Sequence, residues 1–226
     1  MTEKLLCIIG ERYPLTPIPD SCVEGLKASG MKFNIRAYHA EGLGHVSVMT
    51  AKGFFGLMKM DTLIVNPDEV DLPLYSYDRI FAMGNDTLIV ELYDTLSEDG
   101  FSMEDVKAKY PSLTERDPGE HWYDSIKLKE SISKKGKKAD TPLLSELALE
   151  HLCAYLSAAV PTDKAEKKRE KSRYYVEGLL SKGGPSTDAF KKAIGEERTA
   201  ELFRSILFGP IITLSICTSP SPISLG

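Results

Sequence analysis

Short apolar runs separated by turn-forming residues fill the first hundred positions, a pattern typical of β-strands. Residues 5–9 form an apolar run that Gly10 closes, which predicts a buried strand. Residues 33–39 alternate between apolar and polar side chains, as a half-buried strand does. Three further strands are predicted at residues 62–65, 79–83 and 87–93. The sequence Gly84-Asn85-Asp86 lies between the last two and suits a tight hairpin turn.

Helical spacing replaces this alternation in the second half of the chain. Residues 143–156 carry apolar side chains three and four positions apart, and Pro161 stops the predicted helix. A second helix is predicted over residues 164–180 and ends before Gly183-Gly184-Pro185. A last helix runs from about Ser186 to Leu207, with a break near Gly195, whereas residues 98–140 are polar and predict loops and short helices.

Strands that precede helices, without strand-helix alternation, predict an α+β fold. We expect an α/β/α sandwich, with a central antiparallel sheet flanked by helices. One domain over residues 1–209 would contain all of it. Residues 210–226 carry no charge and are rich in Ser, Thr and Pro, so they are predicted to be a C-terminal tail outside the fold.

Composition narrows the class of partner. The 226 residues are 42% hydrophobic, which is enough for a sizeable core, and the formal net charge of -5 argues against nucleic-acid binding. The four cysteines, at positions 7, 22, 153 and 217, lack metal-ligand spacing and are read as reduced thiols. No segment has the length of a membrane span, and the N-terminal apolar run is too short for a signal peptide. The chain is therefore expected to be cytoplasmic, without a nucleic-acid or membrane partner.

Asp78 is the first candidate for chemistry, because it follows Leu72-Pro73-Leu74-Tyr75-Ser76-Tyr77 at the mouth of an apolar strand. Desolvation there would raise the carboxyl pKa, as a proton donor at neutral pH requires. If the predicted strands at residues 62–65 and 79–83 pair antiparallel, Asp61 and Asp78 are near mirror partners. They would then face one another, which would raise the pKa of one of them further. The alternative is structural: Asp61 would be a turn residue, and Asp78 would accept a hydrogen bond at a strand end.

Two segments resemble the ferredoxin-dependent bilin reductase family. In the first, residues 71–78 are followed by Gly84 and by the mainly apolar residues 88–92, in the order typical of the family and without a gap. In the second, residues 193–197, Phe203 and residues 206–209 resemble the terminal helix of that family, with Phe203 in place of a tyrosine. The first segment lies within residues 61–96, and Tyr174 and Tyr175 stand where the family has an aromatic helix before the second; with these parts the resemblance covers about a third of the chain.

The resemblance implies a role for each matching position. Asp78 occupies the place of the acid that protonates the bilin, and Asp61 stands where members hold a histidine or asparagine facing the same ligand. A further acidic residue before the last helix is replaced by glycines, with Asp188 the nearest candidate. The upstream histidine of the family corresponds to His45, but the glutamate that accompanies it is missing.

By this resemblance the protein reduces an open-chain tetrapyrrole, with no bound flavin, metal or nicotinamide. Ferredoxin or flavodoxin would supply single electrons, and Asp78 and Asp61 would supply protons. Residues expected to contact the substrate are His45, Tyr75, Tyr77, Phe203 and Phe208. The basic segments 127–138 and 164–173 are candidate docking sites for an acidic electron donor, although charged runs are usually just solvated faces.

Two alternatives stay open. Beside the reductase, the chain could be a non-catalytic tetrapyrrole or heme carrier on the same scaffold, or an unrelated α+β protein in which the two segments lie far apart in space. In each case we expect a monomer.

Overall fold

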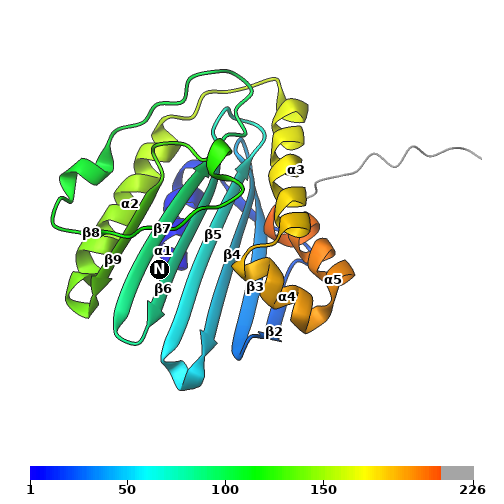
Figure 1. Ribbon diagram of the computed structural model, residues 1–226. Coiled ribbons are helices and arrows are strands. Elements are labelled where there is room, and N and C mark those ends of the chain that lie inside the picture. The colour runs from blue at the N-terminus through cyan, green and yellow to red at the C-terminus, as the bar shows by residue number, and fades with distance from the viewer. Residues whose placement is uncertain (210–226) are drawn as a thin grey trace, which may run out of the picture.

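The computed structural model describes residues 1–209, which form one antiparallel sheet of nine strands covered by helices on both faces (Figure 1). The predicted tail, residues 210–226, lies outside the described residues. The strands are β1 (Leu15–Pro17), β2 (Val23–Ala28), β3 (Met31–Ala40), β4 (Gly44–Gly53), β5 (Met58–Pro67), β6 (Leu74–Ala82), β7 (Asn85–Tyr93), β8 (Thr114–Glu115) and β9 (Ile132–Lys137). Their order across the sheet is β1-β3-β4-β5-β6-β7-β9-β8, and β2 pairs with β3 beside β1. The predicted α+β sandwich is confirmed.

The helices form two layers. They are α1 (Thr2–Arg12), α2 (Thr141–Ser157), α3 (Ala165–Lys182), α4 (Pro185–Ile194) and α5 (Glu196–Glu201), and a π-helical turn η5 (Leu202–Leu207) follows directly. Four short 3-10 turns complete the described chain: η1 (Phe54–Gly56), η2 (Val106–Lys109), η3 (Asp124–Ile126) and η4 (Lys138–Asp140). Helices α1 and α2 pack on one face of the sheet, and α3, α4, α5 and η5 cover part of the other (Figure 1).

The predicted helices are confirmed, including the break at Gly195, but the prediction of a strand at residues 5–9 is wrong. That segment belongs to α1, in which Leu5, Leu6 and Ile9 are buried while Cys7 is exposed. A short apolar run is compatible with either element, and the buried positions follow the helical period. Residues 98–140 also differ from the prediction, because they contain β8 and β9, and β9 pairs with β7.

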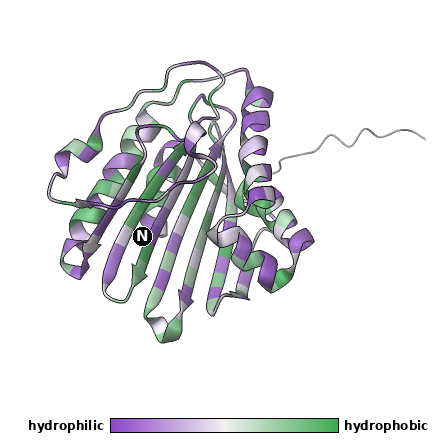
Figure 2. Cartoon of the chain, viewed as in Figure 1, coloured by the Kyte–Doolittle hydropathy of each residue, from purple (hydrophilic) through white to green (hydrophobic). Residues whose placement is uncertain are grey.

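Alternation along the central strands divides the buried side chains into two cores. On β7, Leu88, Val90 and Leu92 pack toward α1 and α2, whereas Ile89 and Tyr93 point to the opposite face. Figure 2 shows apolar positions concentrated along the strands and polar positions on the outer side of α3. Both faces of the central strands are packed mainly with apolar side chains. A charged side chain at the centre of such a strand is costly to bury and needs an explanation.

Within residues 1–209, no helix is long and apolar enough to cross a membrane. The same residues hold no cluster of His, Cys, Asp and Glu suited to a metal ion, and Cys7, Cys22 and Cys153 are free thiols.

Candidate functional site

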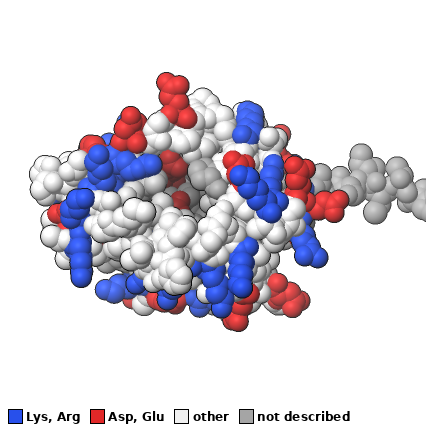
Figure 3. Space-filling model, turned by 60° about the horizontal axis from the view of Figure 1, so that its bottom comes forward, with Lys and Arg blue, Asp and Glu red and all other residues white. Residues whose placement is uncertain are grey.

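A cavity of about 270 Å³ lies between the sheet and the layer formed by α3, α4 and η5. Its floor comes from the centres of β4 to β7, and its mouth is bordered by the loop that carries Arg116, Pro118 and His121. Figure 3 shows the hollow, with acidic side chains in its interior. The floor residues are Met49, Met60, Thr62, Ile64, Ser76, Asp78, Ile80, Ile89, Glu91 and Tyr93. The cavity is thus mainly apolar, with two carboxyl groups in its floor.

Asp78 lies on β6, directly opposite Thr62 on β5, and the Thr62 hydroxyl donates a 2.5 Å hydrogen bond to its carboxylate. Burial raises the pKa of Asp78 to about 6; the hydrogen bond from Thr62 opposes this shift, and the charge of Glu91 adds to it. A carboxyl group with this pKa holds its proton in an appreciable fraction of molecules near neutral pH. Asp78 therefore has the property expected of a general acid.

Glu91 is the second carboxyl group of the cavity. It lies on β7 opposite Ser76, one step diagonally from Asp78. The Tyr93 hydroxyl donates a 2.6 Å hydrogen bond to Glu91, and the Lys127 ammonium lies 3.7 Å from its other oxygen. Lys127 in turn contacts Asp124 at the surface, so polar groups lead from Glu91 toward solvent. Glu91 and Lys127 thus connect the cavity floor with the surface.

Aromatic rings form the wall above these carboxyl groups. Tyr93 and Tyr175 are stacked with ring centres 4.0 Å apart, and Tyr123 meets Tyr93 edge to face at 5.4 Å. Phe203 and Phe208 line the cavity from the C-terminal side, 5.8 Å apart. Flat, apolar surfaces of this kind suit a ligand with conjugated rings. Both phenylalanines thus lie where a ligand in the cavity would meet them, and their contact with a substrate stays a prediction.

Three polar side chains of the sheet fix the C-terminal turn that carries these phenylalanines. His45 Nε2 lies 2.8 Å from the Ile206 carbonyl, the Ser47 hydroxyl donates to the Leu207 carbonyl, and Asn66 donates to the Phe208 carbonyl. Carbonyl groups at the end of a helix lack partners within the helix, and these bonds satisfy them. The prediction that His45 contacts the substrate is not supported, because His45 is buried beneath this turn and does not line the cavity.

The expected pairing of Asp61 with Asp78 is wrong. The register of β5 and β6 places Asp61 opposite Arg79, one position away from the predicted mirror pair. A shift of one residue moves a side chain to the other face of the sheet. Asp61 therefore lies on the α1 face, where the N-terminal amine of Met1 is 3.2 Å from its carboxylate.

Tyr75 and Tyr77 are likewise outside the cavity. They occupy odd positions of β6 and Asp78 an even one, so their rings point to the opposite face, where both are buried in the α2 core. Tyr75 packs against Tyr155 there, with ring centres 4.7 Å apart. Asp188 does not reach the cavity either, because it is exposed on α4.

Sequence reasoning missed Glu91, Arg116 and His121. Glu91 had a recognisable signal, since it is the one charged residue in the otherwise apolar run of residues 88–93. Arg116 and His121 belong to an irregular loop, and only the fold brings this loop to the cavity mouth.

Comparison with known proteins gives a match in structure but none in sequence. No family model matches the chain, and no curated protein matches its sequence. Among solved structures it is similar to that of phytochromobilin synthase from tomato in complex with biliverdin, with a TM-score of 0.69 and 15% sequence identity. The match covers 94% of this chain and 85% of the other. At this identity the similarity shows a shared fold of an open antiparallel sheet flanked by helices.

Proposed function

We propose that this protein is an oxidoreductase that reduces an open-chain tetrapyrrole, with Asp78 as proton donor. The observation that carries the proposal is a carboxyl group with a pKa of about 6 in the floor of an aromatic-walled cavity. The shared fold supports it, because the similar tomato protein was crystallised with biliverdin. The resemblance of residues 71–78 to bilin reductases supports it independently, since Asp78 ends that motif.

The residues of the cavity suggest how such a ligand binds. A four-ring ligand is larger than the 270 Å³ cavity, so part of it would lie at the open mouth or the wall would move outward. Arg116 at the mouth offers positive charge to acidic groups of the ligand. Tyr93, Tyr175 and Phe203 would contact the conjugated rings, and Asp78 would lie beneath them.

Reduction of one double bond consumes two electrons and two protons. Two molecules of reduced ferredoxin or flavodoxin would each be oxidised by one electron, and the tetrapyrrole would pass through a radical. The Asp78 carboxylic acid transfers one proton to the reduced ligand and is left as a carboxylate. Solvent restores this proton and supplies the second, and Glu91 with Lys127 offers a polar route for it.

Docking of the electron donor remains a prediction. Many charges of the two basic segments are already paired within the molecule: Lys134 with Glu115, Lys168 with Asp71 and Lys171 with Asp94. These pairs reduce the positive potential that the sequence alone suggests for both segments.

The test uses purified protein and biliverdin. Addition of protein should shift the visible absorption of the pigment, and reduced ferredoxin under anaerobic conditions should then convert it. Asp78→Asn should bind the pigment with similar affinity and lose about a hundredfold or more in turnover. Turnover of the wild type should fall as the pH rises above about 6, because the carboxylic acid form is lost.

Asp61→Asn is the matched control, since Asp61 lies on the opposite face of the sheet. It should leave binding and turnover unchanged. Absence of any spectral change with biliverdin at micromolar protein would refute the proposal.

A non-catalytic carrier is the second candidate. It is favoured because the cavity has fewer of the expected proton donors than a reductase would use. Of Asp61, Asp78 and Asp188, only Asp78 lines the cavity. A carrier would bind the pigment and give the same spectrum with and without the electron donor.

A further inference from the structure

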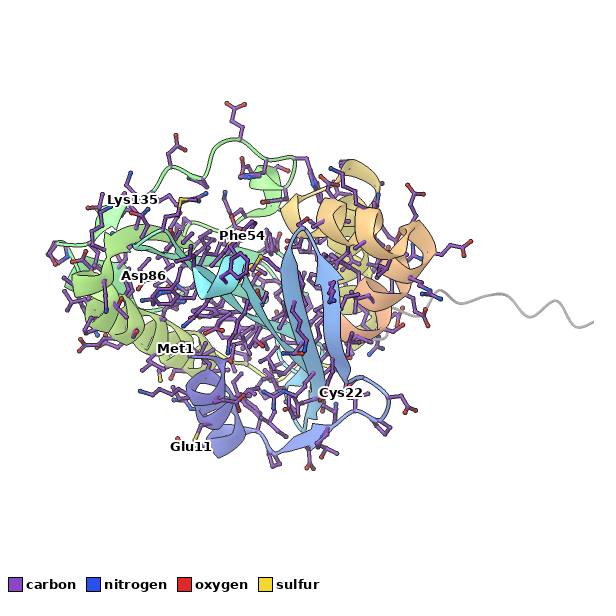
Figure 4. All side chains as sticks on the ribbon, turned by 90° about the horizontal axis from the view of Figure 1, so that it is seen from below. Met1, Glu11, Cys22, Phe54, Asp86 and Lys135 are labelled. Atoms are coloured by element: carbon purple, nitrogen blue, oxygen red, sulfur yellow. The ribbon has the colours of Figure 1, made fainter. Side chains whose placement is uncertain are left out.

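Three hairpin tips meet at one end of the sheet, which we call the lower edge. They are Ser29-Gly30 between β2 and β3, residues 54–57 between β4 and β5, and Met83-Gly84 between β6 and β7. The pairs Met31 with Gly53 and Met58 with Ala82 place these tips side by side. Seen from below, Phe54 marks the middle tip, near the centre of this end of the molecule (Figure 4).

Large apolar side chains project from two of the tips. Phe55 is 109% exposed, Met83 91% and Leu57 71%, so these side chains stand clear of the protein, and Phe54 is 54% exposed. Most large apolar side chains in the described part of the chain are buried, which makes this group unusual. Phe55 and Met83 therefore add almost nothing to the folded core, whereas the Phe54 ring lies beside Gly30.

The backbone at these tips favours other residues. Phe54, Phe55 and Met83 have φ angles of 49°, 55° and 49°, in the left-handed region that bulky residues avoid. Met83 and Gly84 both have positive φ in a two-residue hairpin, the geometry of a type I′ turn, where Asn-Gly is the preferred pair. Folding alone would select asparagine or glycine at Phe55 and Met83. Phe55 and Met83 are strained, and they do not pack against the rest of the protein. Their apolar side chains therefore suggest a contact with another surface.

Four lysines form a row directly behind the tips. Lys27 pairs with Lys32, Lys32 with Lys52 and Lys52 with Lys59, so one lysine on each of β2, β3, β4 and β5 projects from the same face. Neighbouring strands lie about 4.8 Å apart, which makes this a continuous line of positive charge about 15 Å long. Like charges directly opposite one another destabilise a sheet.

No ion pair within the described residues neutralises this row. All four lysines are exposed, and none forms an ion pair with a carboxylate in the part of the chain that the structure describes. The nearest acid on the same face of β5, Asp61, is occupied by the N-terminal amine, and Glu3 is paired with Arg36. Basic side chains are visible around this end of the molecule (Figure 3). The row therefore has charge available for an external anionic surface.

We propose that the lower edge docks on an anionic lipid bilayer, with Phe55, Leu57 and Met83 entering the interface and the lysine row facing the headgroups. Separate protruding points suit a fluid surface, which needs no shape complementarity, better than the continuous patch that a protein partner requires. Lysines beside the apolar points match the charge of acidic headgroups. This is a surface contact and involves no spanning helix. It departs from the expectation of no membrane partner, which rested on the lack of a span.

The test is sedimentation of the full chain with phosphatidylcholine vesicles, with and without phosphatidylglycerol. The wild type should bind only the vesicles that contain the anionic lipid. Phe55→Asn/Met83→Asn should lower the partition coefficient about tenfold or more. Because asparagine suits positive φ, this variant should unfold at the same temperature as the wild type or higher. Weaker vesicle binding by this variant could then not be explained by unfolding of the protein.

Lys52→Gln/Lys59→Gln tests the charged row and should lower binding about tenfold. Its matched control is Lys4→Gln/Lys129→Gln, which removes two exposed lysines outside the row and should bind like the wild type. Phe55→Trp, which keeps a large apolar side chain, should retain binding.

Failure of the wild type to bind anionic vesicles would overturn the proposal, as would binding that both lower-edge variants leave unchanged. An acidic protein that binds this edge in the absence of any vesicle binding would also overturn it. None of these outcomes depends on whether a tetrapyrrole is reduced.

Discussion

The Thr62 hydroxyl and the Asp78 carboxylate face each other across β5 and β6 and are joined by a 2.5 Å hydrogen bond. This bond lies inside the apolar cavity, and burial still raises the pKa of Asp78 to about 6. The desolvation of the carboxylate therefore outweighs the stabilisation that one hydroxyl group provides. An acid held in this way is useful for proton transfer and costly for folding.

Asp78→Asn should stabilise the protein at neutral pH. The folded pKa lies above the unfolded one, so the carboxylate destabilises the native state fully above pH 6 and progressively less as the pH falls toward 4. The gain at pH 8 should be at most about 3 kcal/mol and should disappear near pH 4. Urea unfolding of both proteins across this range measures it. An equal difference at all pH values would show that the charge is not responsible.

His45 should produce the opposite pH dependence. Burial lowers its pKa to about 4, so the unfolded chain binds a proton between pH 6.5 and 4 that the native state does not. Native stability is thus lost as the pH falls, by at most about 3 kcal/mol. His45→Gln should remove this loss, as acid unfolding followed by circular dichroism would show. In the wild type the two effects oppose each other, so Asp78→Asn should be the more acid-sensitive protein.

Glu91→Gln should lower the pKa of Asp78, because the negative charge of Glu91 is one of the causes that raise it. Carbon-13 NMR of the Asp78 carboxyl group should then give a titration midpoint below that of the wild type. Turnover should decline at a correspondingly lower pH. Glu104→Gln, outside the cavity, is the control. An unchanged midpoint would show that the two carboxyl groups are electrostatically independent.

Gly178→Ala should displace Trp122. A Cβ atom at Gly178 would lie 2.1 Å from the Trp122 ring, well inside contact distance. The loop with His121 and Tyr123 would shift with it, at a cost of about 1 to 3 kcal/mol. Trp122 is the only tryptophan of the chain, so its fluorescence reports the change directly. Glu170→Ala, at an exposed position of the same helix, should leave the emission spectrum as it is.

Lys168→Met should destabilise the attachment of α3. The buried Lys168 ammonium donates to the Leu72 and Thr95 carbonyls and lies 3.3 Å from Asp71. Without it these groups lack a buried partner, and we expect a loss of about 3 kcal/mol in free energy of unfolding. Lys167→Met, beside it at an exposed position, removes a single hydrogen bond to the Ser97 carbonyl and should cost only about 1 kcal/mol. Guanidinium unfolding measures both.

The sequence alone determined the class of fold, four of the nine described strands (β3, β5, β6 and β7) and the helices after residue 140, whereas β4 and the short edge strands were not predicted. Alternation predicted the strand around residues 33–39, and helical spacing predicted α2, in which Leu144, Leu147, Leu152 and Leu156 are buried. These patterns are local, because a strand or helix repeats over a few residues whatever it packs against. The N-terminal helix escaped prediction because five apolar residues fit either period.

The site depended on tertiary structure. The register of β5 and β6 decides on which face of the sheet Asp61 and Asp78 lie. A difference of one residue in this register places the two side chains on opposite faces and not opposite each other. Alternation by itself already separates Tyr77 from Asp78, but it does not say which of them meets the cavity. The sequence placed an acid on a buried strand; the packing of α3, α4 and η5 over one face decided which acid has a cavity beside it.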